Sequence, residues 1–404
     1  MKKLTPDPDL EQLVRELNQT EGSEDEPDVP AAETSAWPAA TLSEGNPLER
    51  LLIEMAQRGA SDLLLLAGLP PILRLGGRLT RSDAPALDAA DVQALFAPSM
   101  TSRLRQRLDE DGAADFSLRL GKPVSDEDRR AWRFRVNVHR QRGTLAAAVR
   151  ALPTEVPTLQ QLNLPASLAE LVKPTRGLVL VCGPTGSGKS TTLAALVGEI
   201  NRSEARHVIT IEDPIEYEHR NGKSIIEQVE VGRDSPSFHA ALRAALRQDP
   251  DVILVGEMRD LETVATALTA AETGHLILST LHTSDATQAI HRMVDVFPPA
   301  QQTQIKQQLA LSLNAIVVQQ LIPRSDNNGR AVAVEVLLAN HAVRNHIRQE
   351  RLQNLANEIT LGKRQGMISL EDSLARLVTQ GLITADDARV RSSRPDELES
   401  VMRR

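Results

Sequence analysis

The sequence predicts an α/β protein in which a parallel or mixed sheet is covered by helices on both faces. Short aliphatic strands alternate with helical segments from residue 177, a smaller α+β pattern precedes them, and a mostly helical pattern follows. A chain of 404 residues is long enough for more than one domain. The expected parts are a disordered acidic leader (1–46), an α+β domain (47–152), a linker (153–176), an α/β core (177–297), a mostly helical C-terminal region (298–390) and a tail (391–404).

The leader differs from the rest of the chain in charge. Residues 1–46 carry eleven Asp and Glu against three Lys and Arg, whereas the remaining residues carry 43 of each. The leader is rich in Pro, Glu and Ser, a composition typical of a solvated tether, although residues 10–17 can form an amphipathic helix on docking. Because the rest of the chain is net neutral without a basic stripe, we expect no nucleic-acid partner.

Composition excludes several other classes. The single cysteine, Cys182, excludes a disulfide framework and any metal site built from cysteine pairs. No apolar run approaches the roughly 18 residues of a membrane span. The N-terminal Met1-Lys2-Lys3 is not followed by the apolar stretch of a secretory signal. We therefore expect the chain to stay in a reducing cytoplasm.

The α+β domain is predicted element by element from its periodicity. Asn46-Pro47 is a cap followed by proline and predicts a helix over 47–62. Gly76-Gly77 indicates a hairpin, and a helix is expected near 90–107. An alternating strand over 133–138, a turn at 141–143 and a return strand over 144–152 complete the domain.

The strongest motif opens the α/β core. The residues from Gly183 to Ser190 (GPTGSGKS) fit G-x-x-x-x-G-K-[ST], and they lie between a buried strand and a helix. Glycines let backbone N–H groups converge on phosphate oxygens, while Lys189 reaches the β- and γ-phosphates and Ser190 can ligate Mg²⁺. The motif predicts an ATP-binding loop made by Gly183, Pro184, Thr185, Gly186, Ser187, Gly188, Lys189, Ser190 and the adjoining Thr191.

Two carboxylates follow other predicted strands of the core. Glu212 ends HVITIE and Glu257 follows DVILVG. Ligands of open α/β sheets bind beyond the carboxyl ends of the strands, so both acids can face the bound phosphates. One acid would hold Mg²⁺ and the other would activate water. Alternatively, either acid is a solvated strand end, and Asp213-Pro214 is only a turn initiator.

Histidines and arginines add further candidates. His275 and His282 flank the strand LILSTL, and either can be a γ-phosphate sensor or a packed corner residue; one metal site using both is not expected. Arg133 and Arg135 share a strand face that Arg150 can approach across the hairpin. These arginines either form a polar solvated face or neutralise charge at a nucleotide site.

Two later helices have predicted caps. Ser235-Pro236 is expected to begin a helix that runs to Gln248. Asn340 is expected to cap another, with Val343 and Ile347 facing inward and Arg344 and Arg348 displayed.

Together the motifs resemble those of the secretion ATPase superfamily of type II and type IV secretion systems and type IV pili. GPTGSGKSTTLAAL resembles its Walker A motif, TIEDPIEY its Asp box, LRQDPDVILVGEMRD its Walker B motif and TGHLILSTLHTSDA its His box. GASDLLLLAGLPPILRLGG, RFRVNVHRQRG and HAVRNHIRQERLQNL resemble segments of the pilus retraction ATPases (twitching motility proteins). Leu64 departs from their usual histidine. The single cysteine also excludes the four-cysteine zinc module common in pilus assembly ATPases.

The resemblance implies a RecA-like ATPase core preceded by a PAS-like domain. It implies ATP with Mg²⁺ on Ser190 and Glu257, catalysis by Glu212 and Glu257, sensing by His282 and then His275, and ring contacts by Arg135 and Arg150. The sequence does not decide which glutamate is the general base. It further implies a homohexameric ring at the cytoplasmic face of the bacterial inner membrane, peripheral to it, with a pilus platform protein and a sister retraction ATPase as partners.

The resemblance makes an ATP-driven motor for type IV pilus retraction the first expectation. Two alternatives stay open: an accessory nucleotide-binding subunit that docks to a sister ATPase, and a related type II or type IV secretion ATPase.

Overall fold

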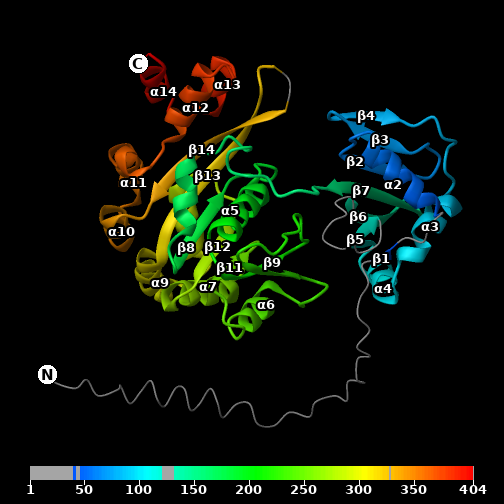
Figure 1. Cartoon of the computed structure of the whole chain (residues 1–404), viewed down its shortest axis with the longest axis horizontal. Helices are drawn as coiled ribbons and strands as arrows, with labels where there is room; N and C mark the ends of the chain where they lie inside the picture. Colours follow the sequence, from blue (N-terminus) through cyan, green and yellow to red (C-terminus); the bar gives the residue numbers. More distant parts are fainter. Residues whose placement is uncertain (1–39, 42–45, 121–131, 327–328, 404) are drawn as a thin grey trace, which may run out of the picture. The chain divides into compact units, whose positions relative to one another are not determined.

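The computed structural model describes residues 40–41, 46–120, 132–326 and 329–403. The described part contains two seven-stranded sheets (Figure 1). One is formed by the expected α+β domain together with residues 40–41 of the expected leader, and the other lies within the larger α/β part. Most of the expected leader, including residues 10–17, lies outside the described residues.

The first sheet is antiparallel except at one edge. Its strand order is β1-β5-β6-β7-β2-β3-β4, and only the β1–β5 pair is parallel. Its strands are β1 (Ala40–Thr41), β2 (Asp62–Leu66), β3 (Ile72–Leu75), β4 (Arg78–Arg81), β5 (Ala113–Leu120), β6 (Trp132–Gln141) and β7 (Thr144–Leu152). Its helices are α2 (Pro47–Gln57), α3 (Ala89–Phe96), η1 (Ala97–Ser99) and α4 (Ser102–Glu110). Leu52, Phe134 and Val136 lie in its buried core.

Local chemistry explains the ends of these elements. The Asn46 side chain accepts a hydrogen bond of 2.9 Å from the amide of Leu48, so the predicted cap is confirmed, although α2 ends at Gln57. Gly76 and Gly77 have φ of +54° and +84° and join β3 to β4. This is the hairpin that the two glycines predicted, because both turn positions require the left-handed region.

The second sheet is parallel except for its last strand. Its order is β10-β9-β11-β12-β8-β13-β14, with β14 antiparallel to β13. The strands are β8 (Gly177–Cys182), β9 (His207–Glu212), β10 (Ile225–Glu230), β11 (Val252–Val255), β12 (Leu276–Leu281), β13 (Leu313–Pro323) and β14 (Arg330–Leu338). The carboxyl ends of its six parallel strands therefore share one edge.

Helices cover both faces of this sheet, as predicted. On one face, η2 (Ala166–Val172) and α5 (Lys189–Ser203) enclose side chains such as Val179 and Val181 of β8. The alternate residues Leu178 and Leu180 face the larger cluster on the other side. That side carries α6 (Phe238–Ala245), α7 (Leu261–Thr273), α8 (Ala286–Asp295), α9 (Pro299–Ser312), α10 (His341–Arg348), η3 (Leu352–Asn354) and α11 (Leu355–Leu361).

Four segments differ from the predicted organisation. Residues 40–41, within the expected disordered leader, form β1 and pair with β5. The expected linker contributes η2, whose Leu168 packs into the core beneath the sheet. The expected helical region contributes β13, which pairs with β8 and carries the edge strand β14, so the sheet continues past residue 297. The expected tail contains a helix with a fully buried leucine, Leu398. The remaining C-terminal elements are η4 (Gly362–Gln365), α12 (Leu370–Thr379), α13 (Ala385–Arg391) and α14 (Pro395–Met402).

The last three helices, α12 to α14, gather in one bundle next to β14 (Figure 1). Among the described residues, no helix combines the length and the apolar character needed to cross a membrane.

Candidate nucleotide-binding site

The glycine loop connects β8 to α5 at the shared carboxyl edge of the second sheet. Gly183, Gly186 and Gly188 have φ of +144°, +77° and +89°, backbone conformations that residues with a Cβ rarely adopt. A Cβ on Gly183 would also lie 2.4 Å from the backbone oxygen of Gln319 on β13. The loop is therefore tight, and its exposed amides lie at the positive end of a 15-residue helix.

Lys189 lies inside this loop with only 8% of its surface exposed. Its Nζ donates to the carbonyl oxygens of Gly183 at 2.9 Å and Pro184 at 3.1 Å. Burial lowers the pKa of the ammonium group, and the nearby carboxylates of Glu257 and Glu216 oppose that shift. The hydroxyl-bearing Ser190 follows in the first turn of α5 and is exposed. A cation and an exposed hydroxyl thus lie next to the loop amides.

Glu257 is brought to this cation, as the strand-end argument predicts. It follows β11, its Oε1 lies 3.5 Å from Nε2 of His282, and it is paired with Arg259. Its negative charge also raises the pKa of Lys189. Glu257 and Ser190 offer hard oxygen donors, which are the ligands that Mg²⁺ prefers. The donor set therefore fits a magnesium ion beside phosphates held by the glycine loop.

Glu212 is held in a hydrogen-bonded position at the end of β9. Its Oε1 accepts from Thr210 Oγ1 at 2.8 Å and from Gln228 Nε2 at 3.1 Å. Burial raises the pKa of this carboxyl group, while those two donors and the backbone of Glu216 oppose the rise. These contacts make Glu212 a brace between β9, β10 and the loop that follows β9.

The sequence reasoning missed Glu216, which lies in that following loop. The negative charge of Glu216 raises the pKa of Lys189, as that of Glu257 does. Glu212 is not among the groups that shift the pKa of Lys189. A signal existed in TIEDPIEY, where a second glutamate follows the Asp213-Pro214 turn by two residues. The neighbouring Tyr217 donates from its hydroxyl to Thr191 Oγ1 at 3.0 Å, so this loop contacts the phosphate-binding helix.

The two histidines occupy opposite ends of β12. His282 follows the strand, and its Nδ1 lies 3.4 Å from Lys189 Nζ and 3.5 Å from Thr185 Oγ1. Desolvation and then the charge of Lys189 lower the pKa of His282, which favours the neutral ring that can accept a hydrogen bond. His275 precedes the strand, and its Nδ1 contacts the carbonyl of Ala270 at 3.1 Å. Of these two histidines, only His282 lies at the glycine loop.

The predicted arginines are brought to each other but not to the loop. Arg135 and Arg150 are directly opposite on β6 and β7, so they share a face as predicted. Arg135 pairs with Asp115 at 3.7 Å and Arg150 with Asp62 at 2.9 Å. Within the described part of the chain neither contacts the glycine loop. Their role in ring contacts stays a prediction.

A third arginine of the same sheet reaches the loop after β9. The buried guanidinium of Arg133 donates to the carbonyl of Ile215 at 2.9 Å and to that of Glu216 at 3.4 Å. Burial lowers its pKa, and Glu218 opposes the shift. Arg133 therefore holds the backbone that carries Glu216.

Comparison with known proteins decides the family. Residues 130–366 match the sequence profile of the Type II/IV secretion system protein family. The chain belongs to this family. It is 42% identical over 349 residues to the type IV pilus retractation ATPase PilT of Pseudomonas aeruginosa, covering 86% of this chain and 99% of that protein. It is 38% identical over 355 residues to the type IV pilus ATPase PilU of the same organism, covering 88% and 91%.

A solved structure agrees with this membership of the type II/IV secretion system protein family. The crystal structure of the pilus retraction motor PilT with bound ADP superimposes with a TM-score of 0.78 at 47% identity, covering 87% of this chain and 98% of that one. The predicted fold class, an ATPase core with an N-terminal α+β domain and a helical C-terminal region, is therefore confirmed.

Proposed function

We propose that this chain is an ATP hydrolase that acts as a motor for type IV pilus retraction. The observation that carries the proposal is the cluster of Lys189, Glu257 and His282 around a glycine loop, in a chain that matches the PilT motor over nearly its whole length. A cation and acids at such a loop are the groups that phosphoryl transfer requires.

Different residues of this chain would bind the triphosphate, hold magnesium and respond to hydrolysis. The loop amides and Lys189 bind and orient the triphosphate, and Ser190 and Glu257 would hold magnesium. Magnesium, when bound, neutralises charge that develops on the phosphate oxygens. His282, which bridges Lys189 and Glu257, is placed to respond when the γ-phosphate leaves.

Two carboxylates are candidates for activating the attacking water. The motif likeness favours Glu212, but its accepting oxygen is occupied by Thr210 and Gln228. Glu216 acts on Lys189 and its backbone is held by Arg133, which supports Glu216 as the base and Glu212 as its brace. A general base must reach the reacting water, and a carboxylate near the phosphate-binding cation meets that condition.

The ring and its partners complete the proposal. We infer a homohexamer in which Arg135 and Arg150 act on the nucleotide of a neighbouring subunit, because they share one strand face, are at least partly exposed and pair with aspartates of their own domain. The ring would dock on a pilus platform protein at the cytoplasmic face of the inner membrane. His275 remains a secondary candidate sensor within such a ring.

A deletion strain tests the motor function. Cells that lack the chain should carry long filaments that do not retract, and the wild-type gene should restore retraction while a Lys189→Ala gene should not. Cells without filaments would instead indicate a role in assembly, and an unchanged surface would indicate a secretion apparatus other than the pilus.

An accessory role is the second candidate, because the similarity to PilU covers as much of the chain as the similarity to PilT. Such a subunit would bind nucleotide and act through a sister ATPase. Steady-state phosphate release by the purified chain discriminates the two. Turnover no higher than that of Lys189→Ala would support the accessory role and refute an autonomous motor.

A further inference from the structure

A buried glutamine on β13 holds the back of the glycine loop. Gln319 is 1% exposed although it is polar. Its strand pairs in parallel with β8 through Val318 and Cys182, so Gln319 lies one residue beyond that pair, beside Gly183. Burying a carboxamide is unfavourable unless its hydrogen bonds are made. The contacts of this side chain therefore indicate why a polar residue stands here.

Both ends of the carboxamide are hydrogen-bonded to the loop and its helix. Nε2 donates to the carbonyl oxygen of Ser187 at 2.6 Å, and Oε1 accepts from the hydroxyl of Thr192 at 2.9 Å. The reverse orientation of the amide would put two acceptors together at the Ser187 carbonyl, which can only accept, whereas the Thr192 hydroxyl could bond to either end. A methyl group on Gly188 would lie 3.1 Å from Nε2, so the glutamine is in close contact with the loop.

The contact to Ser187 has a consequence for the next amide. In a trans peptide the carbonyl and the following N–H point in opposite directions. The carbonyl of Ser187 is directed at Gln319, away from the hollow side of the loop. The N–H of Gly188 in the same peptide is consequently directed to the hollow side, where phosphate oxygens would bind.

We propose that Gln319 is a positioning residue that sets the Ser187–Gly188 peptide in the orientation needed to bind nucleotide phosphate. The proposal deepens the proposed function, since it rests on the glycine loop binding ATP. Thr192 keeps the carboxamide from rotating, because its hydroxyl holds the opposite end. The loop is thereby organised before nucleotide arrives, which lowers the ordering cost of binding.

An isosteric substitution tests the donor. Gln319→Glu keeps the shape but replaces the Nε2 donor with an acceptor that repels the Ser187 carbonyl. Isothermal titration calorimetry with MgADP at pH 8 should show about tenfold to thirtyfold weaker binding, as expected for a lost and opposed buried hydrogen bond. Gln320→Glu is the matched control: its side chain points to the other face of the strand, and its affinity should stay within about twofold of wild type.

Protonation should reverse the defect. A buried carboxyl group has a raised pKa, so the introduced glutamate becomes a donor again as the pH is lowered. At about pH 5.5 the affinity of Gln319→Glu should approach the wild-type value measured at that pH, whereas general damage to packing would not recover. Equal affinity of Gln319→Glu and wild type at pH 8, or a loss that low pH does not reverse, would overturn the proposal.

A second variant covers the case in which Gln319→Glu does not fold, which thermal denaturation would reveal. Thr192→Val removes the hydroxyl that holds Oε1, and it should weaken MgADP binding, while Thr192→Ser should not. Wild-type affinity in Thr192→Val would count against the proposal. Failure of the proposed function is a separate outcome, because it would appear in the wild-type chain itself as absent ATP turnover or an unchanged pilus.

Discussion

At the level of single residues, the division between Glu212 and Glu216 is open to direct test. Glu216→Gln should retain MgATP binding and lose turnover by about a hundredfold or more, because an amide cannot accept a proton from water. Glu212→Gln should lose less than about tenfold, since its amide oxygen can still accept from Thr210 and Gln228. Steady-state phosphate release and calorimetry of nucleotide binding provide the two measurements.

Glu257→Gln serves as a positive control in this series, because the loss of its charge beside Lys189 should abolish hydrolysis but not binding. The opposite ranking, with Glu212→Gln inactive and Glu216→Gln normal, would restore Glu212 as the general base. Normal turnover in all three variants would show that none of these acids is catalytic.

The partly buried His219 should make stability depend on pH. Desolvation lowers the pKa of His219 to about 4, whereas an unfolded histidine has its ordinary value of 6.5. Between these values the unfolded chain binds a proton that the folded chain does not, so stability falls as the pH is lowered from 6.5 toward 4. The loss amounts to about 3 kcal/mol.

His219→Gln should therefore flatten the acid side of the stability curve measured by urea denaturation between pH 7 and pH 4. The matched control is His291→Gln, which removes an exposed histidine and should leave the slope unchanged. An identical slope in His219→Gln and wild type would mean that His219 does not supply this pH dependence.

The residues that sequence reasoning located share one property. Glu257 and His282 lie within two residues of the end of a buried strand, and Lys189 belongs to the glycine motif that links a buried strand to a helix, so each position is visible in the local pattern. Gln319 and Glu216 have no such local mark. Gln319 lies 132 residues from the serine that it contacts, and only the pairing of β13 with β8 brings the two together.

At the level of elements, the kinds of turn and helix cap were predicted better than the residues at which they occur. The Gly76-Gly77 hairpin and the Asn340 cap are confirmed, the latter by a 2.9 Å bond from the amide of Val343. The predicted cap of α6 was wrong. Ser237 caps that helix by accepting from the amide of Ala240, and Ser235 lies before it. A serine on either side of Pro236 fits the same local pattern, so tertiary packing decides between them.

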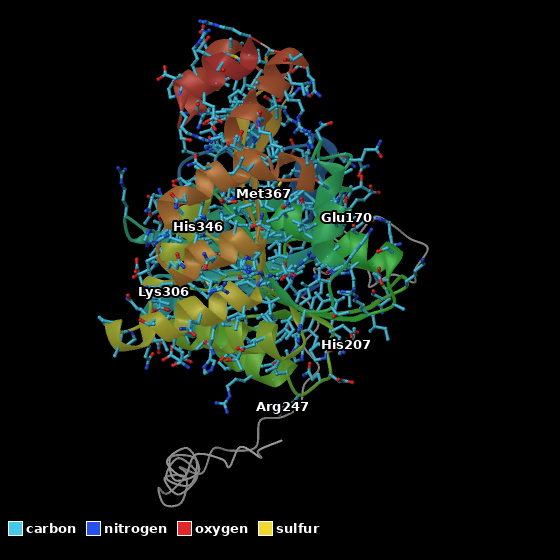
Figure 2. The ribbon with its side chains drawn as sticks, turned by 90° about the vertical axis from the view of Figure 1, so that its left-hand side faces the viewer. Glu170, His207, Arg247, Lys306, His346 and Met367 are labelled. Carbon is cyan, nitrogen blue, oxygen red and sulfur yellow. The ribbon has the colours of Figure 1, made fainter. Side chains whose placement is uncertain are left out.

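The expectation that Arg344 is displayed was also wrong, although Val343 and Ile347 do face inward. The Arg344 guanidinium donates to the carbonyl oxygens of Ala339 at 2.8 Å, of Ala310 at 2.7 Å and of Leu311. Ala310 and Leu311 belong to the last turn of α9, whose final carbonyls lack helical partners. Figure 2 shows the two helices side by side, with Lys306 on α9 and His346 on α10.

Arg344 is consequently a cap for α9, and its removal should lower stability. Arg344→Met should reduce the free energy of unfolding by about 1–2 kcal/mol, because it leaves those carbonyls without their donors. Arg348→Met is the matched control, since Arg348 is exposed one turn further along α10. Urea denaturation measures both; equal stability of the two variants would contradict the capping role.

At the level of the whole molecule, the sequence indicated the class of fold but not where its sheet ends. The pattern after residue 298 is mostly helical, yet β13 and β14 from that region extend the sheet beyond β8. The aliphatic stretches IVVQQLIP and AVAVEVLLA are typical of a hairpin. Which sheet the hairpin joins depends on pairing with a strand more than 130 residues away, and no local periodicity encodes that choice.

The proposed role of Arg135 depends on assembly, because it requires a second subunit. If Arg135 acts across a subunit boundary of the proposed ring, Arg135→Ala should reduce ATP turnover by about a hundredfold or more, because such an arginine neutralises transition-state charge. Arg140→Ala on the same strand is the matched control: Arg140 pairs with Asp109 at an exposed position, and its removal should leave turnover unchanged.

Mixed rings decide whether Arg135 acts on its own chain or on a neighbour. A Lys189→Ala subunit cannot bind phosphate but still presents Arg135, whereas an Arg135→Ala subunit has an intact loop. In a closed ring with head-to-tail contacts, random mixing in equal amounts pairs an intact loop with an intact arginine at about a quarter of the boundaries. Turnover should therefore recover from the background of either variant alone to about a quarter of the wild-type rate. If Arg135 acts within its own chain, no boundary is complete and mixing restores nothing, which would remove Arg135 from the ring contacts.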